Sequence, residues 1–88
     1  MKKILIIEDE KSVRENIVTL LNEESYEALS ASNGDSGISI AIAEIPDLIV
    51  CDIMMPGKDG YAVFKELSKN KMTKTIPFIF LTAKVEHS

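Results

Sequence analysis

Apolar residues fall into two alternating patterns along this chain. Short runs in which every residue is apolar are typical of parallel strands, because such strands are buried on both faces of the sheet. Longer segments with apolar residues three and four positions apart are typical of helices that bury one face. The sequence predicts buried strands at 4–7 and 48–51, an outer, half-exposed strand at 26–32, a last strand at 78–81, and helices at 11–24, 36–44 and 61–69.

The predicted helices carry local start and stop signals. Asp59 stands at an N-cap position for the third helix, and Asn33 begins a turn that can cap the second, which Pro46 closes. Ser12 and Glu15 have the spacing of a capping box for the first helix. The alternative is that this helix begins earlier, in the acidic segment before it, and that both residues lie on the surface.

Each predicted helix has one apolar face, and helices alternate with strands. This order predicts right-handed crossovers and a parallel α/β sheet with both faces covered. Ligands of such sheets bind at the carboxyl ends of the strands, where the strand order reverses. The predicted apolar faces are Val13, Ile17, Leu20 and Leu21 in the first helix, Ile38, Ala41 and Ile42 in the second, and Val63, Phe64 and Leu67 in the third.

Acidic residues follow two of the predicted buried strands. Glu8 and Asp9 come directly after the first strand, and Asp52 comes directly after 48–51, before a stiff loop that contains Pro56. Two neighbouring parallel strands would bring these three carboxylates together at one edge of the sheet. Like charges that close are costly unless a cation or protons separate them. The sequence therefore predicts a divalent-metal site with a carboxylate in reach of a phosphoryl donor.

Composition narrows the class of protein. The chain has 88 residues, enough for one small domain, with 45% apolar and 27% charged residues, as in soluble globular proteins. Its net charge of −4 argues mildly against nucleic acid as a direct ligand. The N-terminal apolar run is too short for an export signal and no stretch reaches membrane-spanning length, so we expect a cytoplasmic location. The single Cys51 is expected to be buried and structural, with a redox role as the alternative.

Three segments carry the pattern of a known family. They are 6–10, then 46–52 with 55–60, and finally 76–84. In this order and at these distances, the chain closely resembles the receiver domain of two-component response regulators over residues 3–84. The resemblance implies an α/β fold, a flavodoxin-like doubly wound parallel sheet, here incomplete with four strands and three helices of the five-unit fold. Residues 1–84 would form the receiver domain without its last helix-strand-helix portion, and 85–88 a tail.

The resemblance implies a role for each matching residue at the acidic edge. Asp52 would be the phosphoacceptor, taking a phosphoryl group from the phosphohistidine of a sensor histidine kinase. Asp9 would bind Mg²⁺ directly, Glu8 would hold it mainly through water, and Met54 would add its backbone carbonyl. The oxygen ligands that Mg²⁺ prefers are the ones present, and soft ligands are lacking at the acidic positions, which disfavours zinc or copper.

The last matching segment would carry the switch. Thr82 would donate its hydroxyl to a phosphoryl oxygen, and Ala83 would leave space for the phosphoryl group. Phosphorylation would then shift the distal face between two states, so the domain would signal rather than act as an enzyme, although family members assist their own phosphorylation and dephosphorylation. The family's lysine after the fifth strand is missing, and Lys84 is not its equivalent. We therefore expect weak Mg²⁺ binding and poor or no phosphate acceptance.

Other functions remain open from the sequence. A receiver fragment could act only as a structural or oligomerising element, self-associating through an exposed fourth strand. A haloacid-dehalogenase-like phosphatase would need a second acid at the position of Met54. A flavin- or nucleotide-binding module would need a phosphate-cradling loop where Glu8 and Asp9 would repel phosphate. Phosphotransfer from acetyl phosphate would separate a phosphoaccepting receiver domain from these alternatives.

Overall fold

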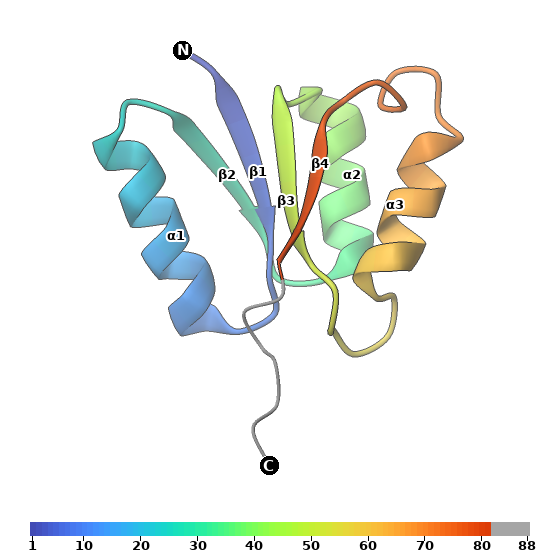
Figure 1. The fold of residues 1–88 in the computed structure, drawn as a ribbon, viewed down its shortest axis with the longest axis horizontal. Helices are drawn as coiled ribbons and strands as arrows, with labels where there is room; N and C mark the ends of the chain where they lie inside the picture. Colours follow the sequence, from blue (N-terminus) through green and yellow to red (C-terminus); the bar gives the residue numbers. More distant parts are fainter. Residues whose placement is uncertain (82–88) are drawn as a thin grey trace.

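The computed structural model describes residues 1–81. Strands and helices alternate along this part of the chain, and every element predicted from the apolar pattern is present with the predicted type (Figure 1). In chain order they are β1 (Lys3–Ile7), α1 (Lys11–Glu23), β2 (Glu27–Ala31), α2 (Gly34–Glu44), β3 (Leu48–Asp52), α3 (Gly60–Ser68) and β4 (Phe78–Leu81).

The strands form one parallel sheet in the order β2-β1-β3-β4. The chain runs from β1 to β2 on one side and then crosses back to β3 on the other. Right-handed crossovers consequently place α1 on one face of the sheet and α2 and α3 on the other. Figure 1 shows α2 and α3 side by side, with α1 across the sheet from them. This is the predicted doubly wound, flavodoxin-like arrangement.

The face toward α2 and α3 holds the continuous core. Alternate residues of β1 and β3 point to it, because successive side chains of a strand face opposite sides. Cys51 is among them and is fully buried, as predicted. α2 approaches β1 closely at Gly37, where a Cβ would lie 2.5 Å from Ile7 Cδ1. The buried core residues are Leu5, Ile7, Ala31, Ala41, Ile49, Cys51, Met55, Val63 and Leu67.

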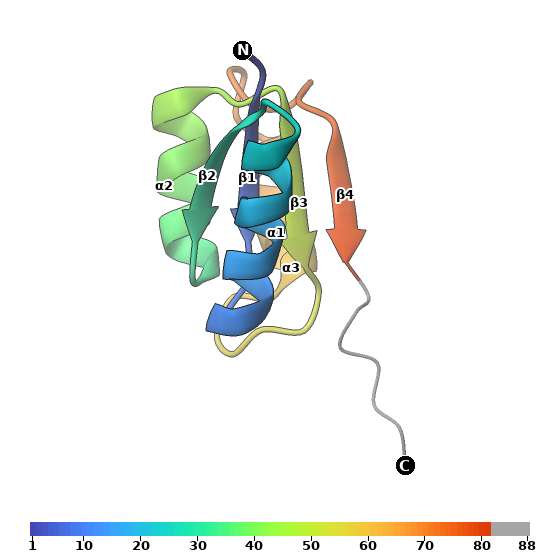
Figure 2. The same cartoon turned by 90° about the vertical axis from the view of Figure 1, so that its left-hand side faces the viewer.

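The opposite face is covered unevenly. α1 packs against β1 and β2, where Ile4 and Ile6 are buried. On the same face of the neighbouring strands, Leu48 and Val50 are only half-buried, and Ile79 is 50% exposed. The prediction that 48–51 is buried on both faces is therefore wrong for one of them, because within residues 1–81 α1 does not reach over β3 and β4. Figure 2 shows β4 standing away from α1.

Three residues predicted on apolar helix faces are largely exposed. They are Leu20 in α1, Ile42 in α2 and Phe64 in α3, with exposed fractions of 61%, 43% and 46%. Each lies at the margin of its apolar stripe, and the width of stripe that is covered depends on the neighbouring element. Phe64 still contacts β4, with its ring centroid 5.1 Å from that of Phe78 and 5.8 Å from that of Phe80.

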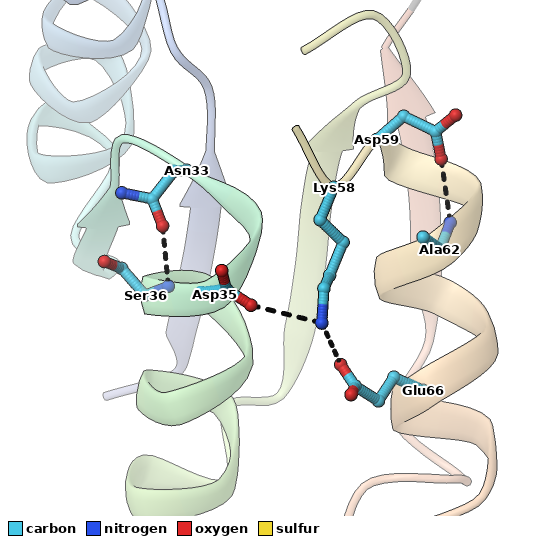
Figure 3. Close-up of polar contacts among 7 residues, drawn as sticks. All are labelled: Asn33, Asp35, Ser36, Lys58, Asp59, Ala62 and Glu66. Carbon is cyan, nitrogen blue, oxygen red and sulfur yellow. Dashed lines mark hydrogen bonds and ion pairs between the residues drawn. The ribbon is translucent and has the colours of Figure 1, made fainter. Parts of the chain in front are cut away.

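The start of α1 also differs from one of the two predicted versions. The helix begins at Lys11 with Glu10 as its N-cap residue, so Ser12 lies inside the helix. The capping box of Ser12 and Glu15 is therefore wrong. The helix starts directly after the acidic segment, and Ser12 and Glu15 lie on the surface, as the alternative predicted. The caps predicted for the other two helices are present: Asn33 accepts a bond from Ser36 N, and Asp59 accepts one from Ala62 N (Figure 3).

Candidate functional site

The carboxyl ends of β1 and β3 bring three acidic side chains together. Ile7 and Cys51 are partners in the β1–β3 register, so Glu8 follows one strand beside Asp52, the last residue of the other. Glu8 and Asp52 are 0% and 1% exposed, and Asp9 is half-buried. Carboxylate oxygens of all three lie within 4.8 Å of one another. The cluster expected from the sequence is therefore assembled by adjacent parallel strands.

The donor set of this cluster fits Mg²⁺. Mg²⁺ is bound through oxygen, and carboxylates held this close gain most from a divalent cation between them. The neighbouring thiol offers no softer ligand, because burial, together with the negative charges of Asp52 and Glu8, raises the pKa of Cys51 to about 12. The thiol therefore stays protonated at neutral pH, and thiolate is the form that binds metals.

Hydrogen bonds hold the loop that carries Glu8 and Asp9. The Glu8 N–H donates to the Ala31 carbonyl at 3.0 Å, which ties the end of β1 to β2. The Glu10 N–H donates to Glu8 Oε2 at 2.8 Å, which orients that carboxylate. From α1, the Arg14 guanidinium donates to the Glu8 carbonyl at 2.9 Å. Sequence reasoning missed Arg14; the available signal was a cation near the start of a helix.

The loop between β3 and α3 carries Met54, whose side chain is 67% exposed. An exposed side chain is compatible with the role expected of its backbone carbonyl. The loop closes through a bond from Gly60 N to the Ile53 carbonyl at 3.0 Å. It turns at Gly57, whose φ of +73° suits glycine, since other residues rarely adopt that conformation.

Lys58 ties the same loop to two helices. Its ammonium group lies 3.1 Å from Asp35 Oδ1 in the first turn of α2 and 2.8 Å from Glu66 Oε2 in α3 (Figure 3). Hydrogen bonds to Glu66 and Asp35 raise the pKa of Lys58. These exposed pairs contribute little stability individually, because solvent screens their charges. Together they tie the loop to the first turn of α2 and to the C-terminal half of α3.

The residues expected to form the switch fall beyond β4. Thr82, Ala83 and Lys84 lie outside the described residues, so their roles stay predictions. The described chain ends at Leu81, which is the register partner of Asp52 in the β3–β4 pair. Within residues 1–81, no helix has the length and apolarity needed to cross a bilayer.

Comparison with known proteins decides the family. Residues 4–88 match the response regulator receiver domain. The chain belongs to this family. Receiver domains are signalling domains that take phosphoryl groups from histidine kinases and generally bind Mg²⁺ at an acidic pocket.

Curated relatives of this receiver domain include two transcriptional regulators. Over 82 residues the chain is 44% identical to the probable transcriptional regulator ycf27 of Porphyra purpurea, covering 93% of this chain and 32% of that protein. Over 85 residues it is 40% identical to the phosphate regulon transcriptional regulatory protein PhoB of Pseudomonas aeruginosa, covering 97% of this chain and 37% of PhoB. The receiver chain thus spans about a third of the length of these relatives.

Solved structures agree with the fold. The N-terminal domain of a response regulator receiver protein from Methanoculleus marisnigri superposes with a TM-score of 0.91 at 30% identity, covering 99% of this chain and 71% of that one. Chemotaxis protein CheY4 of Vibrio cholerae gives a TM-score of 0.91 at 27% identity, with 98% and 72% covered. The flavodoxin-like receiver fold is therefore shared.

Proposed function

We propose that this receiver domain accepts a phosphoryl group on Asp52 from a sensor histidine kinase in a Mg²⁺-dependent reaction. The observation that carries the proposal is the nearly complete burial of Asp52 with its carboxylate within 4.8 Å of those of Glu8 and Asp9. A buried acidic cluster at the carboxyl edge of a parallel sheet, in a member of the receiver family, fits phosphoryl transfer better than a structural role.

The chemistry depends on placement more than on nucleophile strength. A carboxylate is a weak nucleophile, and phosphoryl transfer needs in-line positioning and neutralised phosphoryl oxygens. One oxygen of Asp52 forms the new O–P bond while the N–P bond of the phosphohistidine breaks, and the imidazole leaves with the bonding electron pair. Glu8, Asp9, Asp52 and the Met54 carbonyl would hold Mg²⁺, which supplies positive charge opposite the phosphoryl oxygens when bound.

The readout of phosphorylation belongs to the same proposal. Thr82 would donate its hydroxyl to the bound phosphoryl group, and Ala83 would leave room for it, so that the charge change at Asp52 shifts the domain between two states. Residues 1–84 would constitute the receiver portion, acting in the cytoplasm without direct contact to nucleic acid.

Intact mass after incubation with Mg²⁺ and acetyl phosphate tests the proposal. We expect the wild type to gain one phosphoryl group and Asp52→Asn to gain none. Asp47→Asn is the matched control, because Asp47 is an exposed aspartate that bonds to Lys3 N before β3. A gain of phosphoryl mass by Asp52→Asn would refute Asp52 as the phosphoacceptor. A folded wild type that never gains this mass would favour the second candidate function below.

The second candidate is a structural or oligomerising role without switching. It is favoured by β4, which is the edge strand of the described sheet and carries the half-exposed Ile79. An open strand edge beside apolar surface can pair with another chain. We propose that a second copy of this chain pairs there when the domain is concentrated, and the whole-molecule prediction in the Discussion tests it.

A further inference from the structure

Arg14 stands where helix stability alone would not place it. It is the fourth residue of α1, close to the end where the helix dipole presents partial positive charge. A cation there is locally unfavourable. The first turn of α1 carries no acidic residue, and Glu10 makes no side-chain cap bond. A residue that breaks a local rule often serves something outside its own element.

The guanidinium of Arg14 reaches back to the loop before the helix. Its Nη1 donates to the Glu8 carbonyl at 2.9 Å and makes a longer contact with the Asp9 carbonyl at 3.5 Å. Arg14 is half-buried, so these charge-assisted bonds are partly shielded from solvent. The two carbonyls belong to the residues whose carboxylates lie within 4.8 Å of Asp52. Bonds to these peptide groups restrict the directions in which the two acidic side chains leave the backbone.

We propose that Arg14 is a positioning residue for the cation site, holding the β1–α1 loop so that Glu8 and Asp9 stay arranged before Mg²⁺ binds. This inference rests on the proposed function. Three carboxylates without a cation repel one another, and a loop without its anchor lets them separate. Cation binding would then have to reassemble the loop, and that ordering weakens the observed affinity.

The proposal predicts that removal of Arg14 weakens Mg²⁺ binding, whereas simple electrostatics predicts that it strengthens Mg²⁺ binding. A positive charge near the site repels Mg²⁺, so removing a cation that acts only as a charge would strengthen Mg²⁺ binding. Removing a cation that positions the ligands weakens it. Partners behind metal ligands typically contribute 10–100-fold to affinity, and for the half-buried Arg14 we expect the lower end, about tenfold.

Mg²⁺ titration of the purified chain by calorimetry tests this, with circular dichroism to verify that each variant is folded. Arg14→Gln should bind Mg²⁺ about tenfold more weakly than the wild type. Lys11→Gln is the matched control: it removes a charge from the same first turn, but Lys11 is exposed and pairs only loosely with Glu15, at 3.8 Å. Its affinity should stay within about twofold. Arg14→Lys should recover only part of the loss, because an ammonium lacks the guanidinium fork.

The outcomes separate the two levels of inference. A folded wild type that binds no Mg²⁺ overturns the proposed function and the role of Arg14 with it. A wild type that binds Mg²⁺ beside an Arg14→Gln variant of equal or higher affinity overturns the role of Arg14 alone. Full recovery in Arg14→Lys would overturn positioning by the guanidinium, because an ammonium would then serve equally well. If Arg14→Gln does not fold, Arg14→Lys, which keeps charge and stem, decides by the same comparison with the wild type.

Discussion

Cys51 and Asp52 are neighbours in β3 with opposite chemical consequences of burial. Both side chains are almost completely inaccessible. The carboxylate of Asp52 lies with two others and gains from a cation, whereas the thiol faces the apolar core beneath α2 and α3. Burial and the adjacent negative charges therefore keep the thiol neutral. At the residue scale, the same strand end places a carboxylate in the acidic cluster and keeps a thiol protonated in the apolar core.

The raised pKa of Cys51 makes stability depend on pH in alkaline solution. In the unfolded chain the thiol loses its proton near 9.0, and in the folded chain only near 12. Between these values the folded state binds more protons, so the free energy of unfolding should fall as pH rises, by up to about 1.4 kcal/mol per pH unit. Below pH 9 this contribution should not vary.

Urea unfolding of the wild type and Cys51→Ala at several pH values measures this effect. Lysine titration, including that of Lys3 and Lys58, is common to both proteins and cancels in the difference. Loss of the side chain will shift the free energy of unfolding of Cys51→Ala at every pH. Above pH 9, however, this free energy should fall less steeply with pH than that of the wild type. Parallel curves for the two proteins would show that the thiol is not protected by burial.

At the element scale, contacts with two helices constrain the β3–α3 loop near the site. Lys58 joins it to α2 and α3, and Asp59 caps α3 by accepting a bond from Ala62 N at 2.9 Å. Gly60 then brings the start of α3 against the end of β3. A Cβ at Gly60 would lie 2.5 Å from the Asp52 carbonyl oxygen and 2.8 Å from Ile53 Cα. The position of Asp52 therefore depends on how closely this helix approaches.

Gly60→Ala should separate α3 from β3. The added methyl group meets backbone atoms, which cannot turn aside as a side chain would, so we expect a loss of about 3 kcal/mol of unfolding free energy in urea. Gly57→Ala is the control in the same loop: its Cβ meets nothing within 4 Å, but its φ is +73°. Strain alone should cost it about 1 kcal/mol. Equal stability of Gly60→Ala and the wild type would contradict the close approach.

At the scale of the whole molecule, the elements of residues 1–81 cover the two faces of the sheet unequally. α2 and α3 bury one face, whereas Val50 and Ile79 remain accessible on the other. These two residues are register partners in the β3–β4 pair, so their accessible surfaces adjoin. Small domains bury a limited share of their surface, and an open apolar edge is where a second chain gains most by docking.

Sedimentation velocity over a range of concentrations tests this docking. We expect the wild type to show a concentration-dependent larger species and Ile79→Lys to stay monomeric, because a charge on β4 opposes burial of that strand. Leu20→Lys is the control, since Leu20 is an apolar residue of α1 with 61% exposure. Its association should match the wild type. A wild type that remains a compact monomer at high concentration would contradict self-association.

The sequence alone determined the elements and the membership of the acidic cluster. Continuous apolar runs and apolar spacings of three to four residues are local properties, and Glu8, Asp9 and Asp52 could be placed together because parallel strands share a carboxyl edge. Only the tertiary structure decided how far Leu20 and Phe64 are exposed, since coverage depends on neighbouring elements. It also decided long-range polar contacts such as Lys58 with Asp35. These depend on distances between elements, which no local pattern encodes.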